Sequence, residues 1–295
     1  MRLTAGRLLL LVFASSLASA GPATAADCDR ACLSGFIDRY LAALSKHDPS
    51  GLPLAPNVRF TENGTVKRPG EGLWQSATTV VTRREVMADP VAGQAAFWGV
   101  LDEQGAPVML SARLKIVDQK VTELETIVAR KGSHALFMPD AFGNAPPAFN
   151  QPLEPVQRVS RERLIAAADG YFEGLEKHND KLVPSAVECN RFENGQQMTN
   201  RGGTITPRAC ATAVNGLAHI KRVYNRRYDI VDEERGVVFS TIMFDIPTDA
   251  TATPPREGRM LLLSEVFKIV GGEITRIETV MHNLPYGSPS GWPDR

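Results

Sequence analysis

The sequence carries no net charge and no long hydrophobic run. Its 33 basic residues balance its 33 acidic residues, so the basic patch typical of nucleic-acid-binding proteins is missing. The apolar run near the N-terminus, Leu8–Ala14, is well short of the ~20 residues that a helix needs to cross a bilayer. These two absences argue against a nucleic-acid partner and against stable insertion into a membrane.

Cysteine is also scarce, with only Cys28, Cys32, Cys189 and Cys210 in the chain. No histidine lies at a recognised metal-site spacing from any of them, so no zinc site is predicted. Four cysteines allow three disulfide connectivities. We expect Cys28–Cys32 and Cys189–Cys210, one bond in each half of the chain. The first pair is one helical turn apart, which puts its Cα atoms about 6 Å apart and within disulfide range.

Residues 1–26 are expected to be a secretory signal peptide. Two arginines precede the apolar run, and small residues follow it in an A-x-A pattern, as at a signal cleavage site. Cleavage after Ala20, Ala25 or Ala26 is compatible with the pattern, and the last two are favoured. The sequence therefore predicts a periplasmic or secreted protein, in a compartment where disulfides form.

One segment of the chain occurs twice. Tyr40–Gly64 and Tyr171–Gly195 align without a gap at an offset of 131 and are identical at nine of 25 positions. Two further matches follow in the same order, Lys115–Arg130 with Lys268–Asn283 and Arg83–Leu101 with Arg226–Phe244. A repeat of this length indicates two copies of a whole domain rather than a solenoid.

Each copy is predicted to begin with an amphipathic helix and to continue as strands. Apolar residues recur at three- and four-residue steps over 33–44 and 164–175, which is typical of a helix. Asn-Gly at 63–64 and a run of apolar segments up to 128 predict turns and hairpins. The expected fold class is α+β. We expect domain 1 at 27–137, a proline-rich, extended linker at 138–159, and domain 2 at 160–295.

The helix that contains Tyr40, the acidic residue before the Asn-Gly turn, and the closing hairpin K-I-V-x-x-x-I-T-x-I resemble the nuclear transport factor 2-like (NTF2-like) superfamily. This superfamily includes the ketosteroid isomerases and the SnoaL-like polyketide cyclases. The local likeness to a bacterial ketosteroid isomerase covers Arg39–Leu44, Asp48 and Ala55–Glu62. The resemblance implies two tandem cone-shaped domains, each a curved, mostly antiparallel sheet wrapped round N-terminal helices and enclosing an apolar pocket.

The resemblance also implies candidate catalytic residues. The isomerases use a tyrosine on the first helix as a hydrogen-bond donor to the substrate carbonyl, which matches Tyr40 and Tyr171. They use a carboxylate at the end of the first strand as the proton shuttle, which matches Glu62 and Glu193. The sequence departs from that pattern, because the shuttle is Glu rather than Asp and no counterpart of the isomerases' second acid, on a later strand, is identified.

Six further residues are candidates for substrate binding, and each also has a structural interpretation. His47 and His178 lie near a helix C-terminus, where a cation interacts favourably with the helix dipole. Asn63 and Asn194 are typical turn residues. Trp74 could close a pocket or pack at a domain interface, and His282 has no counterpart in the first copy. The six residues are His47, Asn63, Trp74, His178, Asn194 and His282.

The sequence therefore predicts an exported enzyme for acid–base chemistry on a small, largely apolar organic molecule. The reaction would be an isomerisation, a cyclisation or a lyase reaction, without metal or other cofactor. The chain would be a monomer that mimics the family's dimer within one polypeptide. The alternative is a non-catalytic binding protein for a small molecule. Pairing of Glu62 with Arg59 or Arg83 in a filled pocket would favour that alternative.

Overall fold

The computed structural model describes residues 28–293, so the expected signal peptide at 1–26 lies outside the described residues. Two mixed six-stranded sheets form the body of the molecule, with strand orders β2-β1-β6-β5-β4-β3 and β8-β7-β12-β11-β10-β9. In each sheet the first long strand runs parallel to the last one, and every other neighbouring pair is antiparallel. The expected α+β class and the tandem arrangement are confirmed.

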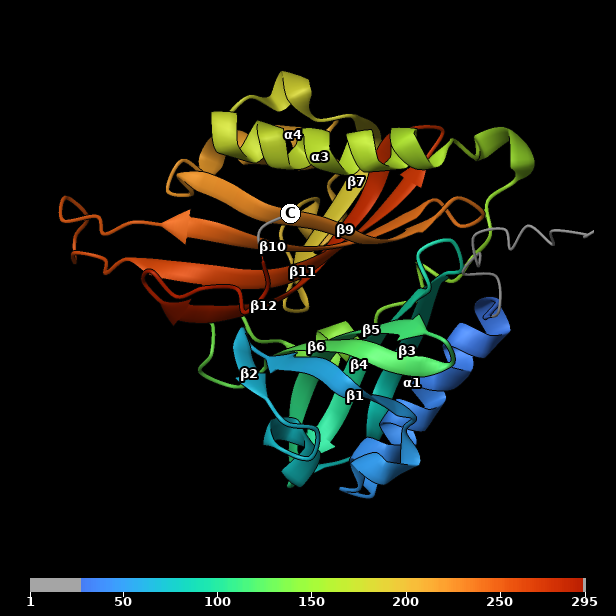
Figure 1. The fold of residues 1–295 in the computed structure, drawn as a ribbon. Coiled ribbons are helices and arrows are strands. Elements are labelled where there is room, and N and C mark those ends of the chain that lie inside the picture. Colours follow the sequence, from blue (N-terminus) through green and yellow to red (C-terminus); the bar gives the residue numbers. More distant parts are fainter. Residues whose placement is uncertain (1–27, 294–295) are drawn as a thin grey trace, which may run out of the picture.

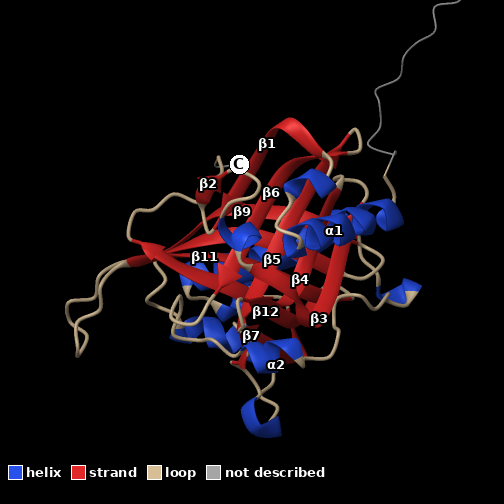
Figure 2. Cartoon of the chain, turned by 90° about the horizontal axis from the view of Figure 1, so that it is seen from below, coloured by secondary structure: helices blue, strands red, loops and turns tan. Residues whose placement is uncertain are grey.

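The first domain is a long helix packed on one face of its sheet (Figures 1 and 2). The side chain of Asp29 caps the helix by accepting a hydrogen bond from the backbone N–H of Cys32 at 2.9 Å, which satisfies one free N–H of the first turn. The elements are α1 (Arg30–Ser45), β1 (Leu54–Glu62), β2 (Thr65–Lys67), β3 (Ala77–Asp89), β4 (Gln94–Glu103), β5 (Ala106–Val117) and β6 (Lys120–Ala129), with 3₁₀ turns η1 (Pro49–Gly51) and η2 (Gly72–Gln75).

The second domain repeats this order with two insertions. Its helix is capped by Ser160, whose side chain accepts a hydrogen bond from the backbone N–H of Arg163. The insertions lie between β8 and β9 and between β10 and β11, so the alignment offset grows from 131 to 153 along the chain. The elements are α3 (Arg161–Lys177), η4 (Asp180–Leu182), β7 (Ser185–Glu193), β8 (Gln196–Gln197), η5 (Arg201–Gly203), α4 (Ala209–Thr212), η6 (Ala213–Gly216), β9 (Arg222–Asp232), β10 (Val237–Ile246), β11 (Arg259–Val270) and β12 (Glu273–Pro285).

The two sheets pack back to back, with α1 and α3 on the outer faces (Figure 1). Each helix covers one face of its own sheet, which we call the inner face of that domain, and a separate apolar core lies between them. A third core fills the space between the two sheets. This central layer also contains charge. Arg227 donates two hydrogen bonds to Glu125 across the domain boundary, at 2.8 and 2.6 Å, and both side chains are buried. The duplicated domains therefore form one joined body.

The segment between the domains is more ordered than the proline content alone suggests. It contains a short helix, α2 (Pro139–Gly143), and a 3₁₀ turn, η3 (Pro155–Gln157). Phe142 and Phe149 are buried in the central core, and the backbone N–H of Phe149 donates to the Glu85 carboxylate at 2.8 Å. The linker is thus part of the interface and not only a spacer.

The chain that follows each sheet packs on the hairpin of the opposite domain. After β6, the carbonyl oxygen of Met138 lies where a Cβ on Gly195 would clash with it, so only glycine allows this approach. After β12, the carbonyl oxygen of Pro289 approaches Gly64 of the first domain, 3.2 Å from where a Cβ would stand, and Trp292 donates to Thr61 at 2.9 Å. The two domains therefore exchange their C-terminal extensions.

Candidate functional site

The cone of the first domain is filled by its own side chains. Trp74, brought in by η2, packs edge-on against Tyr40 of α1 with ring centroids 5.5 Å apart, and both residues are 1% exposed. Glu62 accepts a hydrogen bond from the backbone N–H of Leu73 at 2.7 Å and forms an ion pair with Arg130 at 3.3 Å. Tyr40 and Glu62 therefore come together as expected, but in a packed interior. The partner of Glu62 is Arg130.

The polar candidates of the first domain have structural contacts. His47 adopts a positive φ of 56° after α1 and its Nδ1 lies 2.6 Å from the carbonyl oxygen of Trp74. Asn63 bonds both the N–H and the carbonyl oxygen of Val128, at 2.8 and 3.2 Å. Asn194 makes the same two bonds to Met281 in the second domain. The repeated asparagine thus fastens the end of the first strand to the last strand in both copies.

The second domain has an open pocket in the corresponding place, with a volume of about 230 Å³. Tyr171 of α3 and Glu193 of β7, two of the candidate catalytic residues, line it. Its walls are otherwise mostly apolar and come from α3, the inserted segment after β8, and the inner faces of β10, β11 and β12. The main apolar lining residues are Leu175, Leu217, Ile220, Phe244, Leu261 and Leu263.

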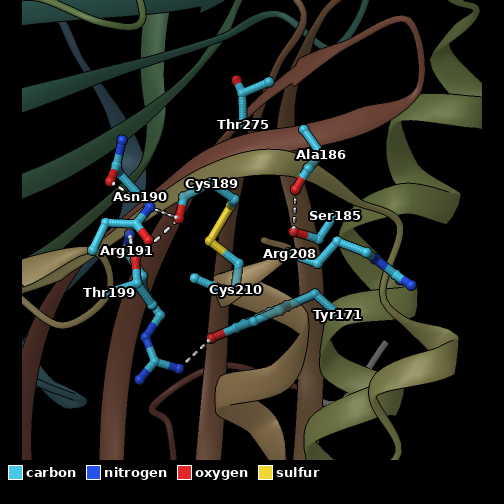
Figure 3. The surroundings of a disulfide bond; sticks show 12 residues. Tyr171, Ser185, Ala186, Cys189, Asn190, Arg191, Thr199, Arg208, Cys210 and Thr275 are labelled. Carbon is cyan, nitrogen blue, oxygen red and sulfur yellow. Dashed lines mark hydrogen bonds between the residues drawn. A yellow bond between two sulfur atoms is a disulfide. The ribbon is translucent and has the colours of Figure 1, made fainter. Parts of the chain in front are cut away.

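Arg191 contacts both Tyr171 and Glu193, the two candidate catalytic residues that line this pocket. It donates a hydrogen bond to the Tyr171 hydroxyl at 3.3 Å (Figure 3), and it forms an ion pair with Glu193 at 3.3 Å. Burial raises the pKa of the Tyr171 phenol; Arg191 opposes this shift, and Glu265 and Glu193 add to it. The phenol therefore keeps its proton at physiological pH, and its O–H can donate a hydrogen bond to a ligand.

The residue that the sequence reasoning missed is Glu265, on β11. It is 2% exposed, lines the pocket, and follows Leu261 and Leu263 on the inner face of the strand. Its Oε2 has no hydrogen-bond partner among residues 28–293. Burial raises its pKa well above the ordinary value, an effect that Arg191 opposes and Glu193 reinforces. Glu265 is therefore a carboxylic acid that holds its proton to unusually high pH.

The two cones differ at the positions that carry this chemistry. Arg191 corresponds to Phe60, and Glu265 corresponds to Ala112. The pairing of strands confirms the second match, because Glu265 lies opposite Thr279 while Ala112 lies opposite Thr126. A comparison of the two copies at Ala112 was the sequence signal that could have identified Glu265.

The mouth of the pocket is formed by half-exposed and exposed residues. His134 comes from the extension of the first domain, His219 from the segment after η6, and Arg259 from the start of β11. Burial lowers the pKa of both histidines; Glu193 opposes this in each case, while Arg259 adds to it. The histidines are therefore neutral near pH 7, and the contribution of His134 from the other domain could not be read from the sequence.

The remaining candidates lie away from this pocket. His178 ends α3 with a positive φ of 51°. The Nδ1 atom of His282, on β12, lies 3.3 Å from the Nδ2 atom of Asn63 in the first domain. His282 therefore lies between the domains. Neither residue is among those that line the pocket.

Both expected disulfides are present. The Cα atoms are 5.1 Å apart in Cys28–Cys32 and 5.6 Å apart in Cys189–Cys210. The second bond ties β7 to α4 next to Tyr171 and Arg191 (Figure 3). It therefore holds the inserted segment that forms one wall of the pocket.

None of the helices in residues 28–293 has the length and apolar character needed to cross a bilayer. In that same part of the chain, no three His, Cys, Asp or Glu side chains are grouped so that they could bind a metal ion.

Three solved structures are similar to this chain. An NTF2-like protein of unknown function from Cytophaga hutchinsonii is 10% identical, with a TM-score of 0.28 over 33% of this chain and 89% of that chain. AclR, a proposed hydroxylase from Streptomyces galilaeus, is 16% identical, with a TM-score of 0.30 over 41% of this chain and 90% of that chain. An LEH-like epoxide hydrolase from M. tuberculosis is 14% identical, with a TM-score of 0.25 over 32% of this chain and 80% of that chain.

One of these three structures is described as NTF2-like, which is the superfamily that the sequence resembles. Among curated proteins, none matches the chain significantly. A family model matches it twice, at residues 26–128 and 157–281, once in each half. The chain therefore belongs to the family described as "Domain of unknown function (DUF8021)" and contains two copies of its domain.

Proposed function

We propose that the chain is an exported enzyme for acid–base chemistry on a small, largely apolar organic molecule, which binds in the pocket of the second domain. The reaction is an isomerisation, cyclisation or elimination that uses no metal or other cofactor. Glu193 takes the proton from carbon, and Tyr171 and Glu265 donate hydrogen bonds to the oxyanion that develops. Tyr40 and Glu62 of the first domain have a structural role.

The observation that carries this proposal is the setting of Glu265. A buried carboxyl group without a cation or a hydrogen-bond donor costs stability, so a purely structural glutamate would have a partner. Glu265 has none at Oε2, and it faces a pocket that also contains Tyr171 and Glu193. Strongly perturbed carboxyl groups in a pocket are typical of catalytic sites.

The surroundings of the two pocket glutamates suit different roles. Glu193 has a cationic partner in Arg191 at 3.3 Å, whereas Glu265 has apolar neighbours on its strand. Glu193 lies opposite Thr279 on β12, and Thr279 lies opposite Glu265 on β11. Adjacent strands are about 4.8 Å apart, so the Cα atoms of the glutamates are about 10 Å apart. Pairs of carboxyl groups in such contrasting surroundings commonly divide into base and acid.

The chemistry follows from these roles. Removal of a proton from the carbon next to a carbonyl group leaves its electron pair on that carbon and, by conjugation, a negative charge on the carbonyl oxygen. Tyr171 and the neutral acid of Glu265 are the donors that stabilise this charge, and their strength is greatest in a water-poor pocket. Glu193 then returns the proton, to a different carbon in an isomerisation.

Other features support the location and the assembly state that we propose. Disulfides persist in oxidising compartments, and the chain has one in each domain. The sheets already cover each other's back faces within one chain. A periplasmic or secreted monomer with an internal pseudo-dimer is therefore the proposed form.

Proton exchange tests the function without knowledge of the product. The purified protein is incubated in D₂O with small apolar ketones and keto acids, together with any ligand that mass spectrometry finds in the preparation. Exchange at the acidic C–H is followed by NMR. We expect Glu193→Gln to slow exchange by about 10²–10⁴-fold, and Tyr171→Phe and Glu265→Gln to slow it by up to about 10²–10³-fold.

Glu62→Gln is the matched control, because it alters the corresponding residue of the filled cone and should leave exchange unchanged. If ligands bind but none undergoes exchange, or if Glu193→Gln and Glu265→Gln exchange as the wild type does, the catalytic proposal is wrong. The alternative, a non-catalytic small-molecule-binding protein, then describes the chain better.

A further inference from the structure

We propose that the ligand of the second-domain pocket is an organic acid whose carboxylate is bound by Arg259 at the mouth, while its apolar body lies on Leu261 and Leu263. This inference rests on the proposed function for the location of the ligand and adds its chemical class. It is carried by Arg259 in the pocket lining, whose side chain forms no ion pair with any residue of the part of the chain that the structure describes.

The charges of the pocket do not cancel. Arg191 and Glu193 form an ion pair and neutralise each other. Burial raises the pKa of Glu265 and so favours its neutral form, and burial lowers the pKa values of both histidines at the mouth, which favours their neutral forms. Arg259 is the remaining charged group of the lining, so the pocket has an uncompensated positive charge.

The guanidinium of Arg259 is also incompletely bonded. Its Nε is buried and has no hydrogen-bond partner, and within residues 28–293 the side chain forms no ion pair. By contrast, nearby Arg256 pairs with Asp249 at 2.9 Å. A buried guanidinium N–H without a partner is costly. A ligand carboxylate supplies a matching pair of acceptors, because it fits the planar fork of arginine.

The position of Arg259 defines how such a ligand lies. Arg259, Leu261, Leu263 and Glu265 alternate along the inner face of β11, so a charged group and a neutral acid stand at the two ends of an apolar strip. The strip spans about 20 Å between the outer Cα atoms, at about 3.4 Å per residue, and the long side chains of both ends shorten this span. The carboxylate therefore binds at the mouth and the reacting carbon lies near Glu265.

The test compares acids with their neutral amides. Naphthalene-2-carboxylate, 4-phenylbutanoate and hexanoate, each with the corresponding primary amide, are titrated into the whole protein by calorimetry and by ligand-observed NMR at pH 7. We expect the acids to bind roughly tenfold or more tightly than their amides, because a charge-assisted pair replaces an unpartnered cation. Arg259→Met should remove this preference and leave the affinity for the amides nearly unchanged.

Arg256→Met is the control, because Arg256 is exposed and already paired with Asp249. It should keep the full preference for acids. Equal affinity of acids and amides, a preference that survives Arg259→Met, or no binding of any acid would overturn the proposal. Failure of the proposed function is distinguishable. If Arg259 selects acids but Glu265→Gln does not alter proton exchange, the acid site stands and the catalytic role falls.

Discussion

Glu265 and Ala112 occupy the same position in the two copies of the fold, on the inner face of the strand that pairs with the last strand of each sheet. The alanine lies in a closed core, and the glutamate lies in a pocket. The exchange of side chain at this position therefore adds a buried acid to the second cone that the first cone lacks at the same place.

The raised pKa of Glu265 predicts a pH-dependent stability. The folded protein holds this proton above the ordinary glutamate pKa of about 4.3, so the unfolded chain binds fewer protons in that range. Stability is then highest below the unfolded pKa and decreases as pH rises towards the folded pKa. We expect Glu265→Gln to gain free energy of unfolding relative to the wild type as pH increases from 4 to 8, measured by urea unfolding. The exposed Glu257→Gln serves as control, and a difference that is constant with pH would contradict the prediction.

Trp74 is expected to be a principal support of the first domain. Trp74→Ala should lower the free energy of unfolding by about 3–5 kcal/mol, since it removes a large buried ring and leaves a cavity. Trp74→Phe should cost less, because the indole Nε1 has no hydrogen-bond partner among the described residues. Thermal unfolding with and without benzene checks this, since benzene should raise the melting temperature of the alanine variant alone. A loss below about 1 kcal/mol would indicate that the cone collapses around the change.

The two disulfides should differ in their effect on stability. Cys189–Cys210 spans 21 residues and Cys28–Cys32 spans 4, and a longer loop restricts the unfolded chain more. Replacing Cys189 and Cys210 by alanine should cost about 2–4 kcal/mol and should weaken ligand binding, because the pocket wall after β8 is released. Replacing Cys28 and Cys32 by alanine should cost less and leave binding intact. Calorimetry measures the stability and the ligand affinity of both variants. Equal effects on ligand affinity would contradict the proposal that Cys189–Cys210 holds the pocket wall after β8 in place.

The ion pair between Arg227 and Glu125 predicts non-additive effects across the domain boundary. Arg227→Met should cost about 3–5 kcal/mol, because it leaves Glu125 buried without this partner. The double variant Arg227→Met with Glu125→Leu should regain part of that loss, since both charges are then absent. A double-mutant cycle by chemical unfolding gives the coupling. Additive losses would show that the two charges are stabilised by other neighbours.

Much of the fold followed from local patterns that are repeated. The apolar stripe of each helix, the Asn-Gly turns and the closing hairpins recur in both copies, and each pattern depends only on neighbouring residues. The same repeat put Tyr171 and Glu193 at the positions of Tyr40 and Glu62, and both line the pocket of the second domain. The packing of the linker did not follow from the repeat. Its prolines indicated a spacer, whereas Phe142 and Phe149 are buried in the central core.

Contacts between distant segments were beyond the sequence. His134 reaches the pocket of the other domain, and Glu62 forms an ion pair with Arg130, from the segment after β6. Both contacts depend on how the chain continues after β6, which no periodicity describes. Glu265 was different, because a comparison of the copies residue by residue would have shown a charge where the first copy has alanine.

The exchanged extensions have a consequence for how the protein can change. In a dimer of identical subunits, every substitution appears at both sites at once. Here Met138 packs on Gly195 and Pro289 packs on Gly64, so the two halves stay joined. The halves are encoded separately within one gene and can therefore differ in sequence. One half is free to acquire charged groups that weaken its own core while the other keeps a closed interior that compensates for the loss. Inheritance as a single chain thus permits a division of labour that a symmetric assembly forbids.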